Sequence, residues 1–168
     1  MRSISSGLLA RIEKLNQTIY ENADPRMYAK ILRITKNLQV YTVASAEAMG
    51  TIDLAVNWPD LSKDPTEIWI AEVINRAGVV KVYDYDEEMD FAAPARMFDL
   101  TTVGVNARVK DIAIAFDGTV TDGQVATTGA PYIAWLERTT SYDSGYVIRW
   151  DGTGTQPAAT EVIKVGRA

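Results

Sequence analysis

The apolar residues change their period at Asp24-Pro25, and this change limits the folds that are open to the chain. Before it, an apolar stripe recurs at the spacing of one helix face and consists of Leu8, Ile12, Leu15 and Ile19. A proline moves the residue before it out of the helical region, so the helix is expected to end here. After it, short runs rich in β-branched and aromatic residues are typical of strands. The pattern predicts an N-terminal helix followed by a mainly β structure.

The strand-like runs continue along the rest of the chain. They comprise residues 27–34, 39–43, 50–56, 78–85, 98–105, 109–116 and 131–137. Residues 67–74 (E-I-W-I-A-E-V-I) fit a buried strand and a short helix equally well. We expect an antiparallel β-sandwich or a barrel-like core. The predicted regions are an N-terminal helical segment (1–25), a β domain (26–106) and a β-hairpin repeat region (107–168).

An internal repeat occurs in the last third of the chain. Residues 114–121 and 148–155 share the pattern I-x-aromatic-D-G-T-x-T at a spacing of 34 residues. In each copy a strand is expected to lead into an Asp-Gly pair, which suits a tight turn. Hairpins that recur in this way are typical of propeller blades, and two ordinary hairpins that look alike are the alternative.

Several chemistries are excluded by residue types that the sequence lacks. It contains no cysteine and no histidine, which removes disulfides, thiolate or imidazole metal sites, and Ser-His or Cys-His catalysis. Glycosidase chemistry needs two carboxylates, but 22 acidic residues without a fixed spacing single out no pair. We therefore expect no enzymatic activity, no catalytic residue and no cofactor.

An acidic run at residues 84–90 has the composition of a calcium loop. It does not fit an EF-hand, because Met89 stands in place of the turn glycine and Ala95 in place of the bidentate acid. We expect a solvated acidic loop and assign no metal site. Calcium binding or contact with a basic partner is the alternative.

Charge is distributed unevenly along the chain. The net charge is +4 over residues 1–40, −8 over 41–100 and −1 over 101–168. Such blocks either attract other copies head to tail or are satisfied within one chain. The overall net charge of −5 argues against nucleic acid as a partner. No apolar run approaches the ~20 residues of a membrane span, so no membrane partner is expected.

Two segments resemble a known class of protein. The opening M-R-S-I-S-S-G-L-L-A, followed by a short polar helix and the strand R-M-Y-A-K-I (26–31), resembles the start of minor structural and fibre-like proteins of long-tailed phages. Residues 132–153 are similar to propeller blades of such proteins and of some lectins and glycosidases. The resemblance implies a structural subunit of a phage virion, in the tail, baseplate or fibre, made in the host cytoplasm. Such a subunit acts through oligomeric assembly with itself and with other virion proteins.

Two sets of residues are candidates for contacts. The stripe Leu8, Ile12, Leu15 and Ile19 is a candidate assembly interface, which docks either between subunits or on the domain's own sheet. Trp135, Tyr142 and Trp150 lie near the last hairpins and are candidates for ligand or receptor contact, because aromatic rings stack on sugars and anchor interfaces. The alternative function is therefore a carbohydrate- or receptor-binding β module, with a cell-surface glycan as its ligand.

Overall fold

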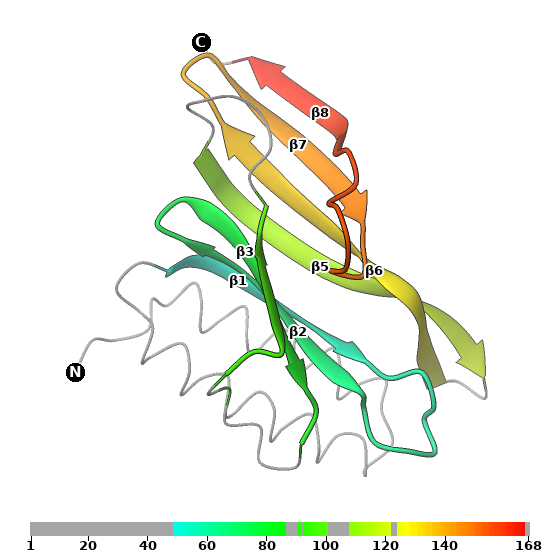
Figure 1. Cartoon of the computed structure of the whole chain (residues 1–168). Coiled ribbons are helices and arrows are strands. Elements are labelled where there is room, and N and C mark those ends of the chain that lie inside the picture. Colours follow the sequence, from blue (N-terminus) through cyan, green and yellow to red (C-terminus); the bar gives the residue numbers. More distant parts are fainter. Residues whose placement is uncertain (1–48, 87–90, 92, 101–107, 122–123, 167–168) are drawn as a thin grey trace.

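The described residues fold into two antiparallel sheets of four strands each (Figure 1). The computed structural model describes residues 49–86, 91, 93–100, 108–121 and 124–166. Sheet A contains β1 (Met49–Asn57), β2 (Glu67–Ile74), β3 (Ala77–Asp84) and β4 (Arg96–Asp99). Sheet B contains β5 (Arg108–Thr121), β6 (Gln124–Arg138), β7 (Tyr142–Arg149) and β8 (Thr160–Gly166).

Each sheet is a meander in which every strand pairs with its neighbour in the sequence. Short turns join β2 to β3 and β6 to β7, whereas longer segments join β1 to β2, β3 to β4 and β7 to β8. At the β2–β3 hairpin, Asn75 and Arg76 have φ angles of 49° and 70° between the paired residues Ile74 and Ala77. Two consecutive residues with positive φ match the right-handed twist of the flanking strands. The prediction of a mainly β fold is confirmed.

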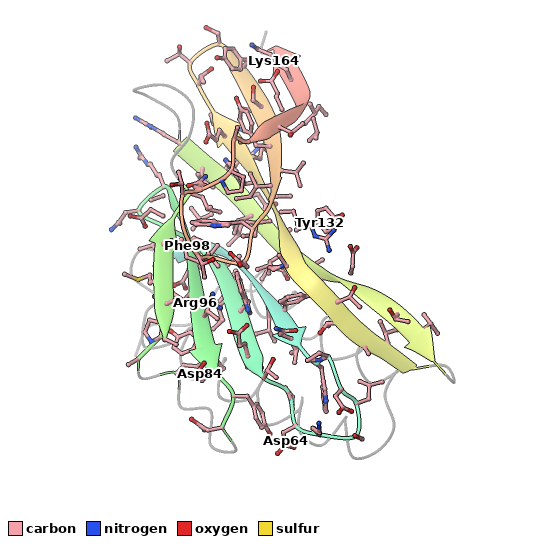
Figure 2. The ribbon with its side chains drawn as sticks, turned by 45° about the vertical axis from the view of Figure 1, so that its right-hand side comes forward. Asp64, Asp84, Arg96, Phe98, Tyr132 and Lys164 are labelled. Atoms are coloured by element: carbon pink, nitrogen blue, oxygen red, sulfur yellow. The ribbon has the colours of Figure 1, made fainter. Side chains whose placement is uncertain are left out.

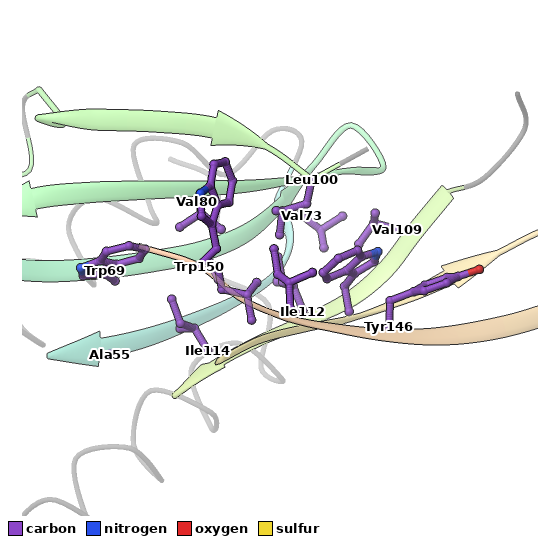
Figure 3. Close-up of a cluster of buried hydrophobic side chains, with 14 of the residues drawn as sticks. Ala55, Trp69, Val73, Val80, Leu100, Val109, Ile112, Ile114, Tyr146 and Trp150 are labelled. Atoms are coloured by element: carbon purple, nitrogen blue, oxygen red, sulfur yellow. The ribbon is translucent and has the colours of Figure 1, made fainter. Parts of the chain in front are cut away.

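The two sheets pack face to face around a shared core (Figure 3). Alternate residues of β2, β3, β5, β6 and β7 point into it, as the period of two along a strand requires. The core includes Trp69, Ala71, Val73, Val80, Val82, Ile112, Ile114, Ile133, Trp135, Tyr146 and Ile148. Because the two sheets remain separate in their strand pairing, the architecture is sandwich-like and not a single closed barrel.

The opposite face of sheet A is buried as well. A second apolar cluster on it is formed by Ile52, Leu54, Ile68, Ile70, Tyr83 and Phe91. Glu72 is fully buried on this face, and its Oε1 lies 2.6 Å from Nζ of Lys81. β2 is therefore enclosed on both faces, and this double burial removes the simple alternation of apolar and polar residues from its sequence.

Direct hydrogen bonds join the sheets along the side where β1 lies beside β5. The backbone N–H of Ile114 donates to Oδ2 of Asp53 (2.9 Å). The backbone N–H of Trp58 donates to Oγ1 of Thr127 (2.6 Å), whose own backbone N–H donates to the carbonyl of Trp58 (3.0 Å). These bonds satisfy backbone groups of β5, of β6 and of the residue after β1, so this side of the sandwich is closed.

The connection between β7 and β8 covers the opposite side of the sandwich. It begins at Trp150, whose ring packs on Phe98 of β4. Arg96 of β4 donates from Nη1 to the carbonyl of Asp151 (2.6 Å) and forms an ion pair through Nη2 with Oε1 of Glu67 (2.7 Å). The segment that connects two strands of sheet B thus encloses the core at this side.

The structure confirms several predicted strands and corrects the repeat. The runs at 50–56, 109–116 and 131–137 lie in β1, β5 and β6, and 67–74 is strand β2. The run at 78–85 lies in β3 except for Tyr85, which follows the strand. In the repeat, Asp117-Gly118 lies inside β5, where it pairs with Thr128 and Thr127, and forms no turn. Only the second copy has a bend, at Gly152 with a φ of 79°. The two copies therefore differ in structure, so they are not equivalent hairpins.

Two other predictions concern the N-terminal region and the boundary between the predicted β domain and repeat region. The N-terminal helix and the runs at 27–34 and 39–43 lie outside the described residues. The predicted boundary between residues 106 and 107 falls between β4 and β5. The sheets on either side of that boundary share one core, so they are two halves of a single packed unit.

Candidate interaction surface

β8 forms an exposed edge of sheet B. Within the described residues it pairs with β7 alone, which leaves its other side without a strand. All seven of its residues are exposed. Val162, Ile163 and Val165 are 62%, 52% and 54% exposed, although β-branched side chains of this size are usually buried. An edge with unpaired backbone groups and apolar side chains is suited to pairing with another strand.

The two charged residues of β8 contact tyrosines of β7 on one face of the sheet. Nζ of Lys164 lies 4.0 Å from the ring centroid of Tyr142, a cation–π contact. Tyr146 donates from its hydroxyl to Oε2 of Glu161 (3.2 Å). Burial raises the pKa of Tyr146, and the nearby Glu161 carboxylate raises it further. These contacts fix the direction in which both charged side chains point.

An irregularity in the β7–β8 pairing sets the faces of β8. Gly145 pairs with Ile163 and Tyr146 pairs with Glu161, so Val162 is an extra residue, as in a β-bulge. On one side of this bulge, Ile163 packs over Gly145, where an added Cβ would lie 2.5 Å from its Cγ2 atom. The bulge thus brings Glu161 and Lys164 to the same face, although they are three residues apart.

The two edges of sheet B differ in how they are protected. β5 donates backbone hydrogen bonds from Ile114 to Asp53 and from Val109 to the carbonyl of Arg76 (2.9 Å), so sheet A occupies part of that edge. β8 lies at the other edge, and Figure 2 shows Lys164 at the end of sheet B that is far from Asp64 and Asp84. The available edge is therefore β8.

The structure corrects the predicted role of two tryptophans. Trp135 is 3% exposed, stacks on Tyr146 at 5.8 Å between ring centroids and donates from Nε1 to Oε1 of Glu137 (2.9 Å). Trp150 is 9% exposed and donates from Nε1 to the carbonyl of Thr153 (2.6 Å). Both rings are part of the core, because the sandwich and the β7–β8 connection enclose them. Neither ring presents a face on which a sugar can stack.

Tyr142 is the one of the three aromatic candidates that the structure places at the surface, where it is partly exposed. Tyr132 is 40% exposed on β6, and the Arg149 guanidinium carbon lies 5.1 Å from its ring centroid. The helix stripe Leu8, Ile12, Leu15 and Ile19 lies outside the described residues, so its predicted contacts remain predictions.

The acidic run at 84–90 borders a small cavity. The cavity measures about 200 Å³ and is lined by Tyr83, Asp84, Asp86, Phe91, Ala93, Pro94 and Ala95. Residues 87–90 lie outside the description, and among the described residues no group of three acidic side chains is placed to hold a metal ion. Within the same residues, no helix has the length and apolar character needed to cross a membrane.

Sequence reasoning missed β8 as a strand and as a surface. The signal was present in T-E-V-I-K-V-G, where three β-branched apolar residues fall within four positions.

Comparison of the chain with protein-family models, with curated proteins and with solved structures gives no match. The function of this surface therefore follows from its own geometry and chemistry.

Proposed function

We propose that the chain is a structural subunit of a phage virion, in the tail, baseplate or fibre, and that it acts by oligomeric assembly and not by catalysis. Its partners are further copies of itself and other virion proteins, so it works within the virion after synthesis in the host cytoplasm. The resemblance of residues 1–31 and 132–153 to phage structural proteins supports the virion part of the proposal.

The observation that carries the assembly part is the exposed β8 edge. Within the described residues, β8 has three exposed β-branched apolar residues and one side without a partner strand, and such an edge costs solubility unless another surface covers it. A partner strand supplies main-chain hydrogen bonds and covers apolar side chains in one step. This chemistry needs surface area and shape, whereas bond-breaking chemistry needs a pocket with positioned acids and bases.

The mass of the full chain as a function of concentration tests this proposal. Light scattering across micromolar concentrations should show a mass above that of the 18.5 kDa chain. Electron microscopy of the same samples should show defined particles or fibres. A monomer at every concentration, alone and with the other proteins of a purified particle, contradicts the proposal.

Two further measurements separate assembly from the other functions. A glycan array tests the carbohydrate- or receptor-binding alternative directly, and selective binding would favour that alternative. Reproducible turnover of a polysaccharide that is lost on replacing one pair of carboxylates would overturn the non-catalytic proposal.

A further inference from the structure

We propose that β8 pairs antiparallel with β8 of a second copy about a two-fold axis, so that two four-stranded sheets B become one eight-stranded sheet. Val162 of one copy lies opposite Ile163 of the other in this pairing. The inference rests on the proposed assembly function and adds to it the partner strand and the register.

The bulge at Val162 makes this register possible. Residues directly opposite each other in an antiparallel pair must lie on the same face of the sheet. With Val162 opposite Ile163, Glu161 lies opposite Lys164 of the other copy. In a regular strand these two residues, three apart, would lie on opposite faces and could not meet. Because of the bulge, Glu161 pairs with Tyr146 and Lys164 pairs with Ser144. Tyr146 and Ser144 both point to the inner face of the sheet, so Glu161 and Lys164 lie on that face as well.

The register places opposite charges across the new pairing. By symmetry, Glu161 meets Lys164 twice, and opposite charges directly across two strands stabilise their pairing. Their contacts with Tyr146 and Tyr142 already direct both side chains to this face. A carboxylate accepts several hydrogen bonds, so Glu161 can keep Tyr146 while it contacts a lysine.

The remaining residues of β8 also favour a second copy as the partner. Thr160 and Val165 lie opposite each other on the outer face in this register, since they pair with Val147 and Asp143 of β7. The two exposed residues at the centre, Val162 and Ile163, then cover each other around the axis. A surface that complements itself in charge and in apolar content is what a two-fold interface requires.

The size of the edge sets the expected strength of association. β8 has seven residues, whereas stable protein interfaces bury about 1,600 Å² in total. A single strand pair is smaller than this, so we expect a weak dimer, whose average mass stays above that of one chain at micromolar concentrations and decreases on dilution.

A charge-swap series on the full chain tests the partner and the register together. Glu161→Lys and Lys164→Glu each place two like charges opposite each other at both symmetric positions. Each single variant should weaken dimerisation at least five-fold in sedimentation or light scattering, and an equimolar mixture of the two should form mixed dimers. The double variant E161K/K164E should restore dimerisation to within about two-fold of the unaltered chain.

The double variant separates contacts between copies from contacts within one copy. It restores Glu–Lys pairing across the interface but does not restore the contacts of Tyr146 and Tyr142 with their original partners. Ile163→Asp should abolish the dimer, while Val125→Asp, at a valine that is 49% exposed on β6, should leave it unchanged. Thermal unfolding of every variant monitors the fold.

The other outcomes distinguish failure of the β8 pairing, failure of the register and failure of assembly itself. A dimer that is insensitive to the charge swaps and to Ile163→Asp overturns the β8 pairing but leaves assembly through another surface in place. Loss of the dimer in all three charge variants overturns the register. A monomer at every concentration overturns both the pairing and the assembly function.

Discussion

The rings of Phe98 and Trp150 lie 4.3 Å apart between centroids and are tilted by 57°, although Phe98 belongs to sheet A and Trp150 follows the third strand of sheet B. The contact depends on the bend that follows Trp150. Gly152 adopts a φ of 79° there, and a Cβ added to it would lie 2.7 Å from Cε1 of Phe98. The backbone therefore passes close to the aromatic pair.

Gly152→Ala should destabilise the fold by about 2–4 kcal/mol, since it combines left-handed backbone strain with a clash in a packed site. Gly154→Ala is the matched control, because Gly154 has a φ of 63° but no atom within 4 Å of an added Cβ. It should cost about 1–2 kcal/mol from backbone strain alone. Urea unfolding measures both, and equal losses would contradict the close approach to Phe98.

Trp135→Ala should destabilise the fold by about 3–5 kcal/mol, as expected for removing a large buried ring. Tyr132→Ala, on the exposed face of the same strand, should cost about 1 kcal/mol or less. Chemical denaturation of both variants distinguishes a core residue from a ligand-contact residue. Unchanged stability of Trp135→Ala would contradict a core role for this ring and favour the predicted role in ligand or receptor contact.

Thr127→Val should destabilise the fold by about 1–3 kcal/mol, because it leaves partly buried polar groups without their partner. The hydroxyl of Thr127 accepts from the backbone N–H of Trp58 and donates to Oδ1 of Asn57 (2.9 Å), which joins the β5–β6 hairpin to β1. Thr119→Val, at an exposed threonine of β5, is the control and should change stability by less than about 0.5 kcal/mol. Similar unfolding midpoints for the two variants would show that this bond adds nothing.

Tyr146 should lose its proton at a higher pH than an ordinary tyrosine. Because the pKa in the folded state is raised, mainly by burial, the neutral phenol stabilises the fold fully below the unfolded pKa of about 10. This stability is lost as the pH rises through the folded value. Titration of tyrosinate absorbance in the unaltered chain should include a group that titrates above the ordinary tyrosine range, and Tyr146→Phe should remove this late group. A titration that keeps its late group in Tyr146→Phe would contradict the assignment.

The buried outer face of sheet A leads to a prediction for the helix stripe. In the described part of the chain, no strand packs on the cluster that contains Ile68 and Ile70. We expect the predicted stripe to cover this face within one chain, so Leu8→Asp together with Ile12→Asp should lower the unfolding temperature strongly. Weaker assembly with an unchanged unfolding temperature would show instead that the stripe docks between subunits.

The fold was predictable where one strand face is apolar, and ambiguous where both faces are. Ile52, Leu54 and Val56 alternate with residues of the other face, so their period of two was sufficient to predict β1. β2 is buried on both faces, so its sequence lacks the polar positions that distinguish a strand from a helix.

Two predictions were wrong, the turn at Asp117-Gly118 and the exposure of Trp150, and both errors have a long-range cause. Asp117-Gly118 has the local chemistry of a turn, but pairing with Thr127 and Thr128 carries the strand through it. Trp150 is next to turn residues, which suggested exposure, yet the following segment folds over the side of the sandwich and encloses it. Neither outcome is encoded in the nearest neighbours along the chain.

The meander order makes each sheet a continuous stretch of the chain, with residues 49–99 in one and 108–166 in the other. Among the described strands, all pairing therefore lies within one stretch or the other, whereas the core is shared between them. Cleaving the backbone between Leu100 and Arg108 would leave each described strand intact and would yield two fragments, each with half of the apolar core uncovered. Such fragments are natural candidates for complementation, in which two separately produced pieces recombine into one native unit and report on whatever brings them together.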